Sequence, residues 1–177
     1  MNDVFFHPKL VHLPMALGAL MPLVAFAIAL AWWRGWLPSK TWWLAVGLQL
    51  VLVGSSVVAL RSGEREEERV EHVVGEARIA AHEEAAKAFT GATAFVLVMM
   101  LTAAAAHTKR AGLPLALGAS MATLAVLGLG IRTGGAGGRL VYEHGAASAY
   151  TKGAAGPSAS PERGGAEASR HEAGDDD

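Results

Sequence analysis

The sequence predicts an all-α membrane protein, an up–down bundle of four transmembrane helices. The 177-residue chain is 52 % hydrophobic and 18 % charged, and its apolar residues are concentrated in uncharged blocks instead of being evenly scattered. Each block is close to the ~20 residues that a helix needs to cross a hydrocarbon core of ~30 Å. Only helices and closed barrels satisfy their backbone hydrogen bonds in lipid, and the blocks lack strand alternation, so we expect helices.

The predicted spans are residues 10–33, 41–60, 88–106 and 111–131. The first block is longer than the apolar region of roughly 7–15 residues in a signal peptide, and Asp3 stands where such a peptide is basic, so we interpret it as a retained span. The connections 34–40 and 107–110 are short, which favours antiparallel neighbours. Five tryptophans surround the first of these connections, and we expect them at the headgroup level.

The long connection between the second and third spans is highly charged. Residues 61–88 carry eight glutamates, and their apolar residues recur at helical spacing. This pattern predicts an amphipathic helix on or capping the bundle, interrupted near Gly75, with Ser62-Gly63 ending the second span. Residues 151–177 are rich in Gly, Ala, Ser, Pro and acidic residues, and we expect a disordered acidic tail after a membrane domain at 1–150.

Several function classes are disfavoured by composition. The chain has no cysteine, which excludes disulfides, thiolate metal sites and covalent c-type haem attachment. A net charge of −1 provides no basic field for nucleic acid. No Asp, Glu, Lys or Arg lies inside a predicted span, which argues against a transporter or pump. No nucleophile stands beside a base, and we interpret the glycines at 134–138 as a flexible turn, so we do not expect an enzyme.

Histidines provide the strongest functional signal. If all four blocks cross the bilayer, five of the seven histidines share one membrane face, namely His7, His12, His72, His82 and His144. His107 lies on the opposite face. Imidazole is the commonest metal ligand and titrates near neutral pH, so this one-sided distribution suggests a site.

The favoured ligands are His12 and His82, with His7 and His144 in support. Such a set could hold one haem b, or a transition metal such as zinc, copper or iron. Because the far face offers only His107, a two-haem path across the membrane is not expected. The alternative is that these histidines serve as caps, backbone hydrogen-bonding groups or solvated surface residues. The chain would then be a cofactor-free structural or scaffold subunit of a membrane complex.

Several motifs also support a family resemblance. They are His7-Pro8, Val11-His12-Leu13-Pro14, a small-residue second span ending at Gly63, His82 before the third span, and Gly138-Arg139-Leu140-Val141-Tyr142-Glu143-His144-Gly145. Over about residues 7–147 the chain resembles a bacterial family of predicted membrane proteins, domain of unknown function 2231. The resemblance implies a four-helix membrane domain in a redox context, since some members are fused to cytochrome-like or Rieske-like domains. We expect this chain to differ from those fused forms in having no second domain, and it differs from them in its acidic stretch at 64–71.

The charges of the short connections favour one orientation. Arg34, Lys40, Lys109 and Arg110 stand there without an acidic residue, although the histidine face has more basic residues in total. By the positive-inside rule we expect a multi-pass protein of the bacterial inner (cytoplasmic) membrane with its histidine face outside. Its expected role is electron transfer or redox assembly with a redox protein partner, and its oligomeric state is left open.

Overall fold

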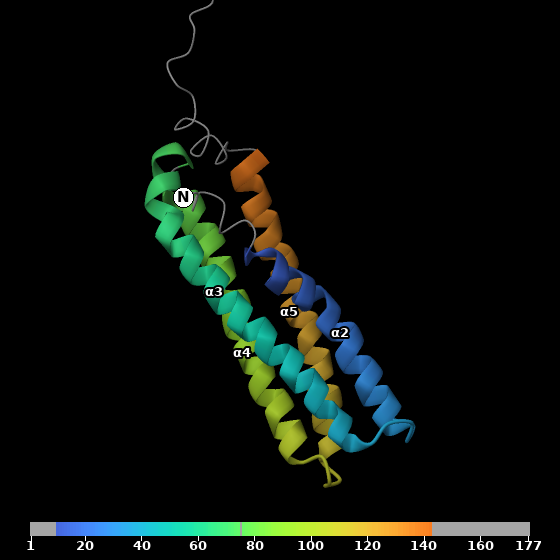
Figure 1. Ribbon diagram of the computed structural model, residues 1–177. Helices are drawn as coiled ribbons and strands as arrows, with labels where there is room; N and C mark the ends of the chain where they lie inside the picture. The colour runs from blue at the N-terminus through green and yellow to red at the C-terminus, as the bar shows by residue number, and fades with distance from the viewer. Residues whose placement is uncertain (1–9, 75, 143–177) are drawn as a thin grey trace, which may run out of the picture.

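Four long helices make up the part of the chain that the structure describes. The computed structural model describes residues 10–74 and 76–142, with the side chains of 66–78 and 140–141 left out. In chain order the elements are α2 (His12–Trp33), the short 3-10 helix η2 (Ser39–Thr41), α3 (Trp42–Val74), α4 (Glu76–Ala105) and α5 (Gly112–Tyr142), as Figure 1 shows. The prediction of an all-α fold is confirmed over these residues. The proposed tail at 151–177 lies outside them.

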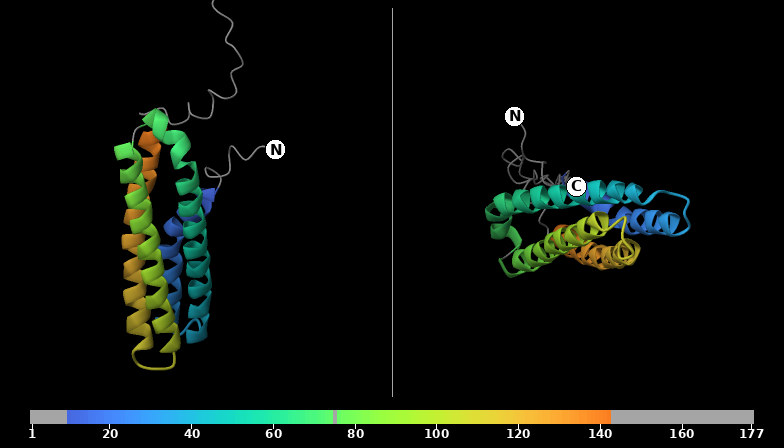
Figure 2. Two further views of the ribbon diagram at one scale, coloured as in Figure 1. Left: turned by 90° about the vertical axis from the view of Figure 1, so that its left-hand side faces the viewer. Right: turned by 90° about the horizontal axis from the view of Figure 1, so that it is seen from below.

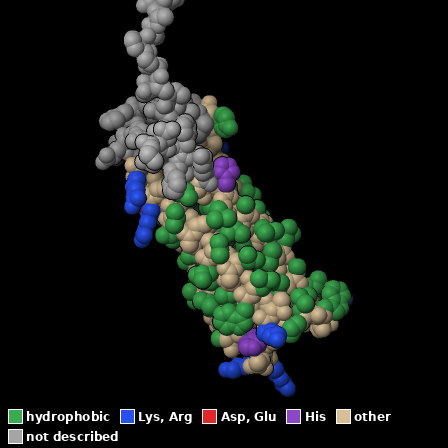
Figure 3. Space-filling view, viewed as in Figure 1, with side chains coloured by type: hydrophobic (Ala, Val, Ile, Leu, Met, Phe, Trp, Pro, Cys, Tyr) green, Lys and Arg blue, Asp and Glu red, His purple; other side chains and the backbone are tan. Residues whose placement is uncertain are grey.

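All four helices are long and apolar enough to cross a membrane. The qualifying stretches are His12–Trp33, Ser39–Arg65, Ile79–Ala105 and Gly112–Arg139, with mean hydropathies between 1.8 and 2.2. On the face in Figure 3, hydrophobic side chains cover the middle of the bundle, while Lys and Arg gather toward its ends. An apolar belt between charged ends is the surface expected of a protein immersed in lipid. The chain therefore has the character of a multi-pass membrane protein.

Neighbouring helices pack as a ring in the order α2, α3, α4, α5, and α5 closes the ring against α2 (Figure 2). The Trp42 indole nitrogen donates to the Met100 carbonyl oxygen over 3.0 Å, and one end of α3 thereby meets the far end of α4. Seven residues further along α3, the Gln49 amide nitrogen donates to the Thr93 carbonyl over 2.9 Å. Since Thr93 lies seven residues earlier than Met100, α3 and α4 run in opposite directions.

Small side chains fill much of the helix interfaces. All four helices contribute fully buried alanines, namely Ala25, Ala29, Ala45, Ala103, Ala104, Ala116 and Ala119. Between membrane helices, close packing replaces water expulsion as the main source of association. Alanine allows the backbones to approach closely, which explains why a sequence so rich in alanine and glycine forms a tight bundle.

The long connection differs from the expected separate amphipathic helix. The helix α3 continues through Ser62-Gly63 to Val74, and α4 begins at Glu76, so the charged stretch consists of the ends of two long helices. The Ser62 hydroxyl donates to the Ala59 carbonyl over 2.8 Å inside α3, and it does not compete with helix formation. Among the described glycines only Gly35 has a positive φ, so Gly63 does not terminate α3. The Glu and Arg residues that follow are strong helix formers.

A second difference concerns the glycines at 134–138. They were expected to form a flexible turn, but α5 continues through them to Tyr142. Glycine disfavours helix by about 1 kcal/mol relative to alanine. Here Gly134 faces Met15 of α2, and Gly137 faces His82 of α4. The packing of α5 against these two helices offsets the low helix propensity of glycine.

The tryptophans near the first connection do not all lie at the surface as expected. Trp33, Trp36 and Trp43 are at least half exposed, which suits the headgroup level. Trp42 is fully buried and makes the hydrogen bond to Met100. The turn after Pro38 and the helix η2 direct α3 back along α2, and this brings the first residue of α3 into the core.

Candidate functional site

The structure places His12 and His82 at the same end of the bundle. His12 is the first residue of α2 and is exposed, and His82 lies in the second turn of α4 and is half-buried. This is the end where α2 begins and α3 turns back into α4 (Figure 1). His107 lies at the opposite end, where its Nδ1 is 2.7 Å from the Ala104 carbonyl oxygen.

The remaining candidates cannot be placed in the same detail. His7 and His144 lie outside the described residues. His72 belongs to α3, near its C-terminal end, and its side chain is not among those described. His12 and His82 are therefore the two candidate ligands whose side chains the structure describes.

His82 packs directly against the backbone of α5. A Cβ built on Gly137 would lie 3.1 Å from His82 Cε1 and 3.5 Å from Nδ1, and Nδ1 is itself buried. One turn along, the Thr133 hydroxyl donates to the Ala85 carbonyl over 3.0 Å and joins the same two helices. The absence of a side chain at Gly137 is therefore what allows the imidazole to enter the α4–α5 interface.

The start of α2 approaches α5 in the same region. A Cβ on Gly134 would lie 2.8 Å from the terminal methyl carbon of Met15. Met15 follows His12 by three residues, a spacing that places two side chains on neighbouring positions of one helix face. Residues 134–137 of α5 are thus contacted by Met15 from α2 and by His82 from α4. These contacts are long-range, and no signal in the sequence identified them.

A small apolar pocket lies deeper in the bundle than these contacts. Its volume is about 80 Å³, and it is lined by Met15, Gly18, Ala19, Phe89, Leu127, Gly130 and Ile131. The Phe89 ring fits between two glycines, since Cβ atoms there would lie 3.4 Å from it at Gly18 and 3.3 Å at Gly130. The lining consists of apolar side chains and glycines, so the pocket is suited to a small apolar group.

The described residues do not by themselves make a complete metal centre. Among the side chains that the structure describes, those of residues 10–65, 79–139 and 142, no group of three or more from His, Asp and Glu lies close enough together to hold a metal ion. The residue that follows His82 in the chain, Glu83, forms an ion pair of 2.7 Å with Lys87. A metal site at this end would therefore need ligands beyond the described ones, such as His7 or His144.

A separate polar cluster lies inside the bundle. The buried polar residues of the described chain are Gln49, Ser56, Thr93, Ser120 and Thr123. The hydroxyls of Ser56 and Thr93 are 3.5 Å apart, and the Gln49 amide nitrogen donates to the Thr93 carbonyl. The Gln49 Oε1 atom is buried with no hydrogen-bond donor among the described residues. Gln49 falls within the predicted span 41–60, but the sequence does not show which helix it meets.

Comparison with known proteins adds no relative. No protein family profile matches the chain, and neither the curated proteins nor the solved structures contain a match.

Proposed function

We propose that this integral membrane protein binds one b-type haem or one transition-metal ion at the end of the bundle that carries His12 and His82, the histidine end. Its role would be electron transfer or redox assembly. The observation that carries the proposal is the position of His82, whose ring is held against Gly137 with Nδ1 buried in the α4–α5 interface. A ligand imidazole needs its second nitrogen fixed by its surroundings, because this sets the ring's orientation and basicity. His12 begins α2, which lies diagonally across the ring from α4, at the same end of the bundle.

Small residues at this end let side chains enter the helix interfaces, and a bound group would take the place of some of them. Glycines at 134 and 137 remove bulk where α2 and α4 approach α5, and the gap between Gly18 and Gly130 already accepts the flat ring of Phe89. The proposed ligands are His82 and His12, with His7 and His144 as further candidates. Bound haem would supply one-electron chemistry, and the apolar surroundings and the histidine ligands would tune its reduction potential. A redox protein partner would exchange the electron.

A cofactor-free scaffold subunit is the second candidate. The observation that favours it is the tight packing of the pocket beneath the histidines, which has a volume of about 80 Å³ and is bounded by the Phe89 ring. In this alternative, His82 fills the space beside Gly137, and His12 is a solvated surface residue at the start of α2. The two candidates differ in whether the purified protein carries a chromophore or a metal.

The first experiment is an optical spectrum and a metal analysis of the full chain, purified in detergent from haem-sufficient cells. A Soret band or stoichiometric metal is expected, and His82→Ala and His12→Ala should abolish or shift it. His107→Ala is the matched control at the opposite end and should leave it unchanged. A folded, colourless and metal-free wild-type protein would overturn the proposal and leave the scaffold candidate.

A second pair of variants tests the position of His82 without removing its ring. In Gly137→Ala the new Cβ would lie 3.1 Å from His82, whereas a Cβ on Gly138 meets nothing within 4 Å. We expect Gly137→Ala to shift the Soret band or lower the metal content, and Gly138→Ala to match wild type. Circular dichroism controls for folding. Equal spectra and metal contents for the two variants would exclude His82 as a ligand.

We further propose that the protein resides in the bacterial inner membrane with the histidine end outside. The basic residues of both short connections support this orientation. Because the chain has no cysteine, single cysteines report each end cleanly. Glu84→Cys should react with a membrane-impermeant maleimide in intact cells, after outer-membrane permeabilisation where one is present, and Lys109→Cys only after the inner membrane is opened. The reverse pattern would invert the orientation.

A further inference from the structure

The end of the bundle opposite His82 carries an apolar groove between α2 and α5. The groove has a volume of about 390 Å³ and is lined by Phe26, Ala27, Leu30, Trp33 and Leu117. Its walls are open to the surroundings, with Trp33 62 % and Leu30 45 % exposed. From Phe26 to Trp33 the groove follows α2 for about 10 Å, given the helical rise of 1.5 Å per residue. It is therefore an elongated apolar surface that ends near the membrane boundary.

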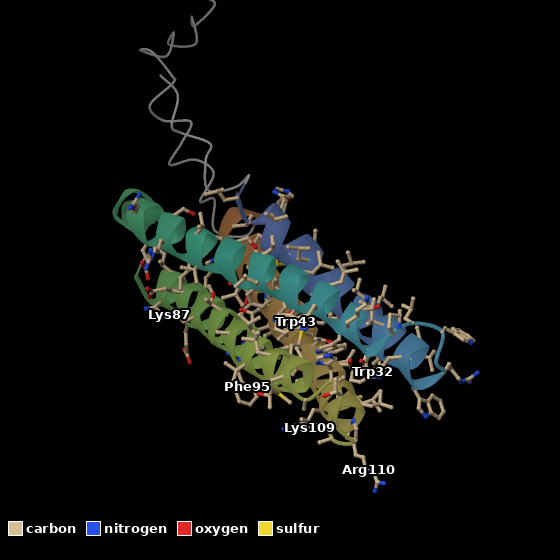
Figure 4. The ribbon with its side chains drawn as sticks, turned by 60° about the horizontal axis from the view of Figure 1, so that its bottom comes forward. Trp32, Trp43, Lys87, Phe95, Lys109 and Arg110 are labelled. Atoms are coloured by element: carbon tan, nitrogen blue, oxygen red, sulfur yellow. The ribbon has the colours of Figure 1, made fainter. Side chains whose placement is uncertain are left out.

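Basic side chains lie at the same end of the bundle as this groove. The Arg34 guanidinium carbon lies 5.3 Å from the centroid of the Trp33 ring and 5.8 Å from that of Trp36. Lys109 and Arg110 project from the turn between α4 and α5 (Figure 4), and α5 begins two residues later. The segments 31–45 and 103–120 contain no acidic residue. The end of the bundle is therefore positively charged, without compensating carboxylates in its own segments.

The placement of Arg34 favours a phosphate ligand. A guanidinium that stacks on aromatic rings keeps its N–H edges available, and such edges match phosphate oxygens bidentately. Its position directly after Trp33 puts the charge at the mouth of the apolar groove. The groove and the charge together match a molecule with an apolar chain and an anionic head.

We propose that this face binds an anionic phospholipid of the surrounding leaflet. One acyl chain lies along Phe26–Trp33 against Leu117, and the phosphate contacts Arg34 with support from Lys109 and Arg110. Basic side chains near a membrane surface attract anionic lipid, and the leaflet that positive ends face is the one expected to contain it. The site is at the opposite end from His82, so it does not depend on the proposed cofactor.

The test is native mass spectrometry of the full chain after delipidation. The probes are phosphatidylglycerol and phosphatidylcholine with identical acyl chains, and inorganic phosphate alone. We expect phosphatidylglycerol to be retained preferentially, and Arg34→Gln to weaken its binding by about fivefold, the effect of one basic residue near a membrane surface. The matched control Arg139→Gln, at the far end of α5, should leave binding unchanged.

A groove-filling variant tests the acyl chain separately. Leu117→Trp should lower binding of phosphatidylglycerol, whereas Leu50→Trp, at an exposed position on α3, should not. Equal retention of the two lipids, or equal effects of Arg34→Gln and Arg139→Gln, would overturn the proposal. Inorganic phosphate that competes as strongly as the lipid would show a headgroup site without the groove, and it would also overturn it.

Discussion

Replacement of Gln49 by methionine should stabilise the bundle. Gln49 is fully buried, and its Nε2 donates to the Thr93 carbonyl while its Oε1 meets no donor among the described residues. Methionine is also unbranched and has a similar helix propensity, so the substitution mainly exchanges the amide for an apolar group.

The expected magnitude follows from two opposing contributions. The lost hydrogen bond is of a kind that averages about 0.6 kcal/mol between membrane helices. The Thr93 carbonyl keeps its place in the hydrogen bonding of α4, so it is not left unsatisfied. Removal of a buried acceptor without a donor relieves about 1–3 kcal/mol. The net expectation for Gln49→Met is a gain of about 0.5–2.5 kcal/mol in the free energy of unfolding.

The assay is reversible unfolding in mixed micelles of increasing SDS fraction, followed by far-UV circular dichroism. Leu52→Met is the matched control, because Leu52 is fully buried one turn further along α3 and carries no polar group. This control should cost less than about 1.5 kcal/mol. A Gln49→Met protein that is no more stable than wild type would refute the reasoning, and would indicate that Oε1 has a hydrogen-bond donor such as an internal water.

Three further substitutions have defined outcomes in the same unfolding assay. Gly112→Ala should destabilise the turn before α5 by more than about 1 kcal/mol, because its Cβ would lie 2.5 Å from the Ala106 carbonyl oxygen. Trp42→Phe should cost at least about 0.5–1.5 kcal/mol through loss of the hydrogen bond to Met100, and unchanged stability would argue against that bond. Gly35→Ala should cost about 1–2 kcal/mol because φ is +72° there, and a stabilising effect would contradict the left-handed turn.

The four membrane helices were predictable because their signal is local. Runs of about twenty apolar residues specify spans regardless of what they pack against. The limits of the helices were less predictable. The helix α3 passes Ser62-Gly63, and α5 passes the glycines at 134–138, because local helix breakers were outweighed by hydrogen bonding within α3 and by packing of α5 against Met15 and His82.

The candidate site shows the same division between local and long-range information. The presence of His12 and His82 at one end of the bundle follows from counting the spans between them. The contact of His82 with Gly137 joins residues far apart in the sequence, and it depends on how α4 and α5 cross. Periodicity likewise could not show that Trp42 is buried while Trp43 is exposed, since both lie at the start of one apolar helix.

The unequal ends of the helices have a consequence for bilayer thickness. At the Arg34 end the helices terminate in short turns with exposed tryptophans and basic residues, which anchor that end at one interface. At the other end, α3 has 33 residues and a length of about 50 Å, against a hydrocarbon core of about 30 Å. The helix α3 continues past the edge of the hydrocarbon core at this end. A thicker or thinner bilayer therefore changes how many of its residues lie within the lipid. A mismatch between the length of the helices and the thickness of the bilayer would thus be accommodated at the end that carries His82. The polarity around the His82 imidazole would then depend on the thickness of the bilayer.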